Sequence, residues 1–255
     1  MNQLERQRLA DGTPVLVKHN EAAPKGFYAA EAAGLQALAD AGWRVPKVMS
    51  VADDRLVMEA IALGQPGSTS WQQAGRQLAQ QHQISAERFG FSLDTFCGDS
   101  RQTNRWCADG VEFYQQQRYR PQLQRARDAG LLSAAEVQAA ERLVDKLADW
   151  LPAQKPVLLH GDLWSGNLLF DAAAVPVLID PACYYGWPEA DLAMTHAFGG
   201  FAPEFYRAYQ AENTLAPGFD ERIALYNLYH WLNHLNLFGA VYHGAVVAVL
   251  ERYLG

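Results

Sequence analysis

The sequence predicts an α+β fold in which a small antiparallel sheet precedes a mostly helical part. Short apolar runs separated by turn signals fill about the first sixty residues, and helix-forming segments with recognisable caps fill most of the remainder. Gly64, Pro66 and Gly67 interrupt the chain between them. We therefore expect a boundary between residues 1–62 and 63–255. A chain of 255 residues is long enough for two lobes around a cleft.

The first part of the chain has the pattern of a sheet with one helix. Asp11-Gly12 is a dipeptide typical of a hairpin turn between two strands. A later stretch rich in Ala and Leu ends at Gly42, which favours a helix there. We expect strands at residues 3–9, 13–19, 45–48 and 55–58, and a helix at 25–41.

The second part predicts helices. Asp109 and Ser133 each lie three residues before a glutamate, and Thr69 begins a similar capping signature. Pro188 suits a first helical turn. Residues 84–108 are long and irregular, and a loop of that length is usually functional or disordered. We expect helices over about 70–83, 110–129 and 134–150, from Pro188 to Phe198, from Pro203, and over 219–238.

The composition argues against several classes of protein. The net charge of −7 argues against a nucleic-acid binder, which needs a basic surface for phosphates. No apolar run reaches the roughly 18–20 residues that span a bilayer, and the first residues lack the apolar core of a secretory signal. Cys97, Cys107 and Cys183 lack the spacing of a zinc site or a disulfide framework. We therefore expect a cytoplasmic protein that binds neither nucleic acid nor membrane.

Residues 157–191 carry the most informative motif. An H-G-D tripeptide ends at Asp162, Asn167 follows, and Asp180 comes directly after a short apolar run. Phosphoryl-transfer loops have this layout: an aspartate accepts a hydroxyl proton, while an amide and a second aspartate offer oxygens to magnesium. One such residue alone would fit a polar surface loop. The ordered set, with a hairpin expected to place Asp180 beside Asn167, favours phosphoryl transfer.

Residues near the N-terminus could bind a nucleotide. Lys18 ends the second expected strand and could hold the α- and β-phosphates, although an exposed strand-end lysine is the simpler interpretation. Glu31 lies on the following helix and could pair with Lys18. Glu59, Ala60 and Ile61 leave the sheet where backbone groups could bind adenine, and an ordinary connection explains them equally well.

Three further groups have two interpretations each. Asp191, near the start of an expected helix, could complement the helix dipole or anchor the catalytic loop. Arg118 or Arg120 could reach a substrate or structural carboxylate, or lie on a solvated face. His230 and His234 have the spacing of a helical metal pair, but tryptophan replaces the glutamate of H-E-x-x-H. They could be core groups or part of a polar stripe facing a substrate.

Over nearly its whole length the chain resembles the fructosamine (ketosamine) kinases, relatives of the aminoglycoside and choline kinases. HGD occurs throughout the wider superfamily, whereas the Leu-Trp-Ser-Gly insertion and DPACYYG distinguish the ketosamine branch. The resemblance implies a protein-kinase-like fold with a small sheet lobe and a mostly helical lobe. The most specific motifs are HGDLWSGNLLFD at 160–171, VLIDPACYYGWPEADLAMTHAFGGF at 177–201 and LYNLYHWLNHLNLFG at 225–239.

The resemblance implies a deglycation enzyme. Such kinases use ATP and Mg²⁺ to phosphorylate a sugar hydroxyl of ketosamines, which are sugar adducts of amines, and the phosphorylated adduct breaks down. The amine could be free or part of a protein. By position, the resemblance assigns the base to Asp162, magnesium to Asn167 and Asp180, phosphates to Lys18 with Glu31, adenine to Glu59, Ala60 and Ile61, and sugar contacts to Trp164, Asn233 and His234.

The pKa of Asp162 is expected to stay near its ordinary value. Phosphoryl transfer asks for positioning and charge neutralisation more than for covalent chemistry. A carboxylate base beside magnesium needs no raised pKa, because proton transfer can occur late.

The start of the sequence departs from the resemblance. The family has a glycine-rich loop between its first two strands, whereas residues 1–11 contain no glycine and resemble the sequence just after such a loop. We therefore expect either a truncated first strand and loop or a natural short form, with an exposed strand edge that could pair two chains. The protein would be a monomer or homodimer. The alternatives are a kinase of another hydroxylated amine and a weakly active pseudokinase.

Overall fold

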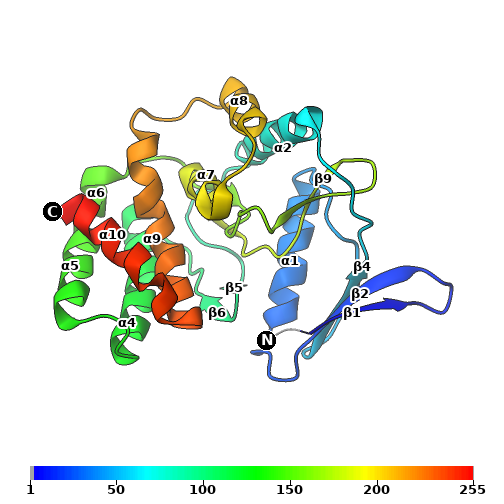
Figure 1. Cartoon of the computed structure of the whole chain (residues 1–255), viewed down its shortest axis with the longest axis horizontal. Helices are drawn as coiled ribbons and strands as arrows, with labels where there is room; N and C mark the ends of the chain where they lie inside the picture. The colour runs from blue at the N-terminus through cyan, green and yellow to red at the C-terminus, as the bar shows by residue number, and fades with distance from the viewer. Residues whose placement is uncertain (1–2, 255) are drawn as a thin grey trace.

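The N-terminal sheet carries one helix on its face. The computed structural model describes residues 3–254. The antiparallel sheet has the order β1-β2-β4-β3 and is built from β1 (Gln3–Arg8), β2 (Pro14–His19), β3 (Val48–Val51) and β4 (Arg55–Glu59). Helix α1 (Phe27–Asp40) packs against it (Figure 1), where Phe27 and Tyr28 share an apolar cluster with Leu56 and Met58.

The hairpin predicted around Asp11-Gly12 is confirmed. The two strands pair from Gln3 opposite His19 to Arg8 opposite Pro14. Gly12 has a φ of 86°, a left-handed conformation that glycine adopts without the steric cost of a Cβ.

The strand predicted at residues 45–48 is wrong in position, because β3 begins at Val48. Pro46 has no N–H to donate to a ladder. The carbonyl of Arg44, the residue just before this segment, instead accepts a hydrogen bond of 3.0 Å from the N–H of Leu178 in β9 (Pro176–Leu178). This segment therefore joins the sheet to the rest of the molecule.

Helices dominate the chain after residue 67, as predicted. The helix expected over 110–129 contains a π-helical turn at Gln115–Tyr119, just before Pro121. Helix α10 was not predicted, since only a short turn after Gly239 separates it from α9. The helices are α2 (Ser68–Gln81), α3 (Gly110–Tyr114), α4 (Arg120–Asp128), α5 (Ala134–Asp145), α6 (Leu147–Trp150), α7 (Pro188–Thr195), α8 (Pro203–Glu212), α9 (Phe219–Phe238) and α10 (His243–Leu254).

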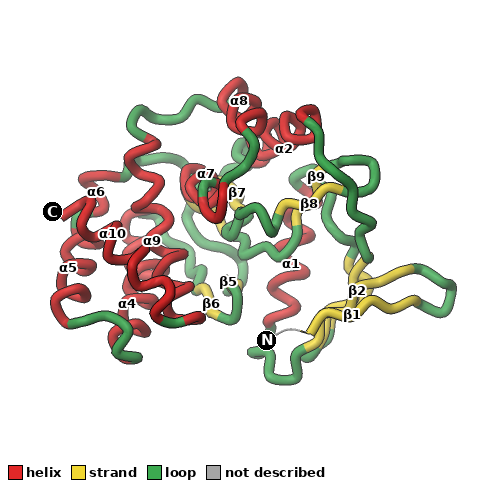
Figure 2. The backbone as a smooth tube through the Cα atoms, in the orientation of Figure 1, coloured by secondary structure: helices red, strands yellow, loops and turns green. Residues whose placement is uncertain are grey.

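Short strand pairs lie between the sheet and the helices (Figure 2). The long irregular stretch at 84–108 is ordered and contains the hairpin β5–β6. Its backbone is held by Asp94, which accepts a hydrogen bond of 3.0 Å from the N–H of Asn104. Besides β9, these strands are β5 (Thr95–Cys97), β6 (Ser100–Gln102), β7 (Val157–Leu159), β8 (Leu168–Phe170) and β10 (Tyr184–Gly186).

Helix α9 is the buried helix of the second part, as its nearly continuous apolar pattern predicted. It packs against α7, α4 and α10 (Figure 1). Within residues 3–254, no helix is long and apolar enough to cross a bilayer. The boundary predicted near residue 62 falls in the segment that joins β4 to α2. As a division into domains, it stays a prediction.

Candidate active site

The catalytic-loop motif follows β7 and is anchored by Asp191. The buried carboxylate of Asp191 accepts hydrogen bonds from the N–H of His160 (2.7 Å) and of Gly161 (2.9 Å). Burial acts to raise the pKa of Asp191, but hydrogen bonding to His82 and the loop outweighs it and lowers the pKa. Of its two interpretations, Asp191 therefore takes the loop-anchoring one.

Gly161 allows the loop to pass close to a neighbouring strand. Its φ is 83°, and a Cβ at this position would lie 2.1 Å from the carbonyl oxygen of Ala182. The N–H of Ala182 donates a hydrogen bond of 2.9 Å to the carbonyl of His160. The tight loop therefore depends on glycine between the histidine and the aspartate.

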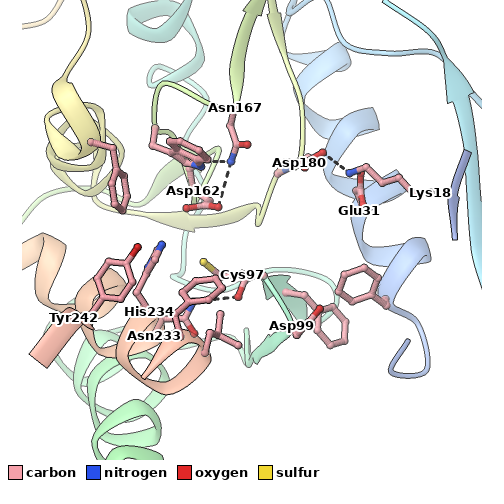
Figure 3. A pocket seen from close by; sticks show the side chains of 18 residues that line it. Lys18, Glu31, Cys97, Asp99, Asp162, Asn167, Asp180, Asn233, His234 and Tyr242 are labelled. Atoms are coloured by element: carbon pink, nitrogen blue, oxygen red, sulfur yellow. Dashed lines mark hydrogen bonds and ion pairs between the residues drawn. The ribbon is translucent and has the colours of Figure 1, made fainter. Parts of the chain in front are cut away.

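The β8–β9 hairpin brings Asn167 and Asp180 together, as predicted. Leu168 pairs with Leu178, and the N–H of Ile179 donates to the carbonyl of Asn167 (3.1 Å). The Asn167 amide nitrogen donates to the carbonyl oxygen of Asp162 (2.8 Å) and to its carboxylate (3.2 Å). This orientation leaves the Asn167 side-chain oxygen on the side away from Asp162 (Figure 3).

Lys18 makes the predicted contact with Glu31. Its Nζ lies 2.6 Å from Glu31 Oε1 and also contacts the carboxylate of Asp180. Burial acts to lower the pKa of Lys18, but the two carboxylates outweigh it and raise the pKa. The sheet, helix α1 and the end of β9 thus meet at one ammonium group (Figure 3).

One cavity of about 460 Å³ is lined by the polar side chains of Lys18, Glu31, Asp162, Asn167 and Asp180 (Figure 3). Its lining also includes aromatic rings, those of Trp164, Phe198, His234, Phe238 and Tyr242. The Trp164 and Phe198 rings meet edge to face with centroids 5.4 Å apart, and His234 lies 5.4 Å from Phe198. The cavity therefore combines polar groups with aromatic rings.

The predicted sugar-binding residues all line this cavity, but they differ in how many hydrogen bonds their side chains already make. Trp164 lines it, and His234 bonds through Nδ1 to the carbonyl of His230 (2.7 Å), while its Nε2 has no hydrogen-bond partner within residues 3–254. Asn233 already uses its amide: it donates to the carbonyl of Cys97 (3.1 Å) and accepts from Gln122 (3.0 Å). A hydroxyl contact for Asn233 stays a prediction.

A second, smaller cavity of about 140 Å³ lies beside the predicted hinge. Glu59, Ala60 and Ile61 line it, and Lys18 and Asp180 line both cavities. The Glu59 carboxylate is held by Arg44, which lowers its pKa. Among residues 3–254, the N–H of Ile61 makes no hydrogen bond. The remaining apolar walls include Leu16, Met58, Leu169 and Ile179.

The prediction that the pKa of Asp162 stays near its ordinary value is wrong for the chain without a bound cation. Burial, reinforced by the negative charge of Asp180, raises this pKa to about 7. The prediction took only a neighbouring cation into account. The sequence did not show that the chain encloses the carboxylate, nor that Asp162 Oδ1 would be buried without a hydrogen-bond partner among the described residues.

Arg118 and Arg120 have structural partners. The buried Arg118 guanidinium donates to Asn104 Oδ1 (2.6 Å) and lies 4.1 Å from the centroid of the Tyr184 ring. Arg120 lies 3.4 Å from Glu141 and also contacts Asp145. Arg118 therefore reaches no carboxylate, and Arg120 reaches structural ones.

Several residues of the cavity were not predicted from the sequence. Phe198, whose φ of 53° is left-handed, projects into it just before Gly199, and Tyr242 reaches it from the turn after α9. Cys97 lines it from the β5–β6 hairpin, where the unusual length of the loop was the available signal. His230 stands behind Cys97, with Nδ1 4.0 Å from Cys97 Sγ.

Known proteins are similar in sequence to this chain over most of its length. The model of the fructosamine kinase family matches residues 2–255. A chloroplastic protein-ribulosamine 3-kinase of Arabidopsis thaliana is 37% identical over 255 residues, which cover 96% of this chain and 77% of the relative. A probable ketoamine kinase of Lactiplantibacillus plantarum is 41% identical over 233 residues, 89% of this chain and 82% of the relative.

Solved structures share its fold. A Thermobifida fusca crystal structure, named provisionally as a fructosamine-3-kinase, matches with a TM-score of 0.91 at 37% identity, covering 98% of this chain and 89% of its own. A macrolide 2′-phosphotransferase type I matches with a TM-score of 0.64 at 16% identity, over 100% and 88%, which shows the fold alone. The kinase-like fold implies ATP with a divalent metal. The chain belongs to the fructosamine kinase family.

Proposed function

We propose that this protein is an ATP-dependent kinase that phosphorylates a sugar hydroxyl of ketosamines. The observation that carries the proposal is Asp162, whose side chain lines the larger cavity and is held there by the Asn167 amide. Trp164 and His234 line the same cavity, and Lys18 lines both cavities. A hydroxyl acceptor and a nucleotide could therefore meet between them.

Asn167 and Asp180 fit a divalent cation. The side-chain oxygen of Asn167 is turned away from Asp162, and the Asp180 side chain is 46% exposed. Both groups are hard oxygen donors, which Mg²⁺ prefers to nitrogen or sulfur. We infer that they hold Mg²⁺ together with the phosphates of ATP. A cation held there neutralises negative charge on the transferred phosphoryl group.

The smaller cavity suits the adenine of ATP. Its walls are mostly apolar, and the unengaged N–H of Ile61 could donate to a ring nitrogen. Lys18 stands at the junction of the two cavities, where its ammonium could contact the α- and β-phosphates while Glu31 fixes its position. Glu59 contributes through its backbone, because its carboxylate is held by Arg44.

In this proposal Asp162 orients the sugar hydroxyl and takes its proton. The Asn167 amide bonds one oxygen of the Asp162 carboxylate, and this side chain lines the cavity in which the acceptor would bind. Trp164 would stack on the sugar face, and Nε2 of neutral His234 would accept from a second hydroxyl, since burial lowers the pKa of that imidazole. The chain thus supplies positioning and a proton acceptor, as phosphoryl transfer requires.

A coupled ADP-release assay tests the proposal. Ribulose and fructose adducts of lysine should each be offered with Mg²⁺ and ATP. We expect Asp162→Asn to lower kcat by about 10²–10⁴-fold, the usual contribution of a general base. Asp53→Asn, in an exposed turn of the sheet, is the matched control and should retain activity. Equal rates for Asp162→Asn and the natural protein, or no substrate-dependent ADP release, would overturn it.

The cytoplasmic location and the monomeric or homodimeric state remain predictions. ATP and reduced thiols are abundant in the cytoplasm, where three free cysteines, Cys97, Cys107 and Cys183, are readily maintained. The deglycation role follows from the proposed substrate class.

A further inference from the structure

A thiol, an imidazole and a carboxylate converge beside the proposed acceptor site. Cys97 Sγ lies 4.0 Å from His230 Nδ1, and His230 Nδ1 lies 3.7 Å from Asp162 Oδ1. The three ligand atoms all lie within 4.8 Å of one another. The residues come from the β5–β6 hairpin, helix α9 and the catalytic loop. Three separate elements of the fold therefore place these atoms together.

None of the three atoms is committed to a strong partner within residues 3–254. Asp162 Oδ1 is buried and meets no hydrogen-bond geometry among these residues, and Cys97 Sγ makes a long contact with the imidazole and weak ones with Asp162 and Asn233. His230 is 6% exposed, and its Nδ1 lies toward both of the other atoms. A neutral imidazole is the form that binds a metal ion.

The spacing suits a tetrahedral zinc ion. Zn–S bonds of about 2.3 Å and Zn–N and Zn–O bonds of about 2.0–2.2 Å place ligand atoms roughly 3.3–3.6 Å apart in a tetrahedron. The observed 4.0 Å and 3.7 Å need movements of only a few tenths of an ångström. Cys97 and Asp162 both line the larger cavity, so an ion would approach them from that side.

We propose that Cys97, His230 and Asp162 form a second metal site, which binds Zn²⁺ and thereby inhibits the kinase. Thiolate and imidazole favour Zn²⁺ over Mg²⁺, so the site is chemically distinct from the oxygen donors Asn167 and Asp180. On binding, the Cys97 thiol proton leaves to solvent and its sulfur becomes the third ligand with the imidazole and the carboxylate. The inhibitory part rests on the proposed role of Asp162, whose carboxylate would no longer accept a hydroxyl proton.

Cobalt substitution tests the metal site without reference to kinase activity. The full chain, with any tag histidines removed, should be titrated with Co²⁺ in the absence of nucleotide. We expect one equivalent to give a thiolate-to-cobalt charge-transfer band that Zn²⁺ abolishes. Cys97→Ser and His230→Gln should each lose the band, whereas the matched controls Cys107→Ser and Cys183→Ser should keep it. No band in the natural protein, or an undiminished band in Cys97→Ser, would overturn the site.

Inhibition is measured separately, with Mg²⁺ and ATP in excess. We expect Zn²⁺ to inhibit ADP release in competition with the sugar substrate, and Cys97→Ser to need at least about tenfold more Zn²⁺. This factor corresponds to about 1.4 kcal/mol. Equal sensitivity of the two proteins would overturn the inhibitory part. A cobalt band in a protein without ketosamine kinase activity would instead reject the proposed function and leave the metal site standing.

Discussion

Asp162 meets two opposing demands at the scale of a single residue. A proton acceptor must keep an oxygen free, and Asp162 Oδ1 has no hydrogen-bond partner among residues 3–254. A buried carboxylate without full hydrogen bonding destabilises the folded state when it is ionised. The raised pKa expresses this conflict, since burial and Asp180 both favour the protonated form.

This conflict predicts a pH-dependent gain in stability for Asp162→Asn. The folded-state pKa of about 7 exceeds the unfolded value of 3.8, so the folded chain holds the proton more tightly. The protonated carboxyl therefore stabilises the folded state fully below pH 3.8, and this stabilisation is lost as the pH rises through 7. In urea unfolding with EDTA, the variant should gain about 1–3 kcal/mol over the natural protein between about pH 5 and about pH 8. A constant difference, like that expected for exposed Asp53→Asn, would contradict it.

Lys18 and Glu31 are buried partners, and their free energies should be coupled. Lys18 is 5% exposed and Glu31 is 9% exposed. Removing one member of a buried pair leaves the other charge uncompensated and costs about 3–5 kcal/mol, whereas replacing both can be nearly neutral. Because Asp180 also contacts Lys18 and would still compensate it, we expect the lower end of that range for Glu31→Gln, and the upper end for Lys18→Met, which leaves two carboxylates without their cation.

The double variant Lys18→Met/Glu31→Gln should recover most of the lost stability without recovering ATP binding. Denaturant unfolding measures the first quantity, and the KM for ATP measures the second. If the two single changes were additive in stability, the two side chains would not form the coupled pair that their 2.6 Å separation indicates.

At the scale of elements, close approach of helices α2 and α8 covers one side of the catalytic loop. Gly75 of α2 faces α8 so closely that a Cβ would lie 2.2 Å from the carbonyl oxygen of Phe205 and 3.0 Å from Ala208. His82, just after α2, hydrogen bonds with Tyr209 of α8 at 2.8 Å and lies 3.5 Å from Asp191. The helix pair therefore supports the residue that anchors the catalytic loop.

Gly75→Ala should destabilise the protein by about 1–3 kcal/mol, the usual cost of overpacking, because backbone atoms must move. Gly244→Ala is the matched control within a helix: nothing lies within 4 Å of the added Cβ, so stability should stay equal or rise by up to about 1 kcal/mol. Thermal unfolding of both variants gives the comparison. A Gly75→Ala protein as stable as the control would mean that α2 and α8 can separate at little cost.

At the scale of the whole molecule, the nucleotide is expected to join the sheet to the helical part. Lys18 and Asp180 line both cavities and come from the two sides. Gly12 lies in the outer turn of the β1–β2 hairpin and lines neither cavity (Figure 1). The turn of the β1–β2 hairpin therefore contributes no glycine to either cavity.

A non-hydrolysable ATP analogue with Mg²⁺ should raise Tm. Ligand at a hundred times its Kd stabilises the folded state by about 2.7 kcal/mol, which corresponds to roughly 5–10 °C for a chain of this size. EDTA should reduce the shift, and Lys18→Met should nearly abolish it. No shift at millimolar analogue would contradict nucleotide binding and favour the pseudokinase alternative.

The elements show how far sequence patterns reach. The hairpin at Asp11-Gly12, the caps at Asp109 and Ser133 and the buried helix α9 are local or periodic signals, and the structure confirms them. The strand at 45–48 was misplaced because Pro46 cannot donate to a ladder and the adjoining Arg44 bonds to Leu178, far away in the chain. Residues 84–108 gave no periodic signal, although their hairpin reaches the cavity.

The sequence by itself determined the order Asp162, Asn167 and Asp180, the pairing of Lys18 with Glu31, and the family. Those follow from residue types at fixed spacing, which one hairpin and one helix translate directly into space. Tertiary structure alone decided the burial of Asp162 and the approach of Cys97 and His230, since burial and pKa depend on neighbours contributed by distant segments.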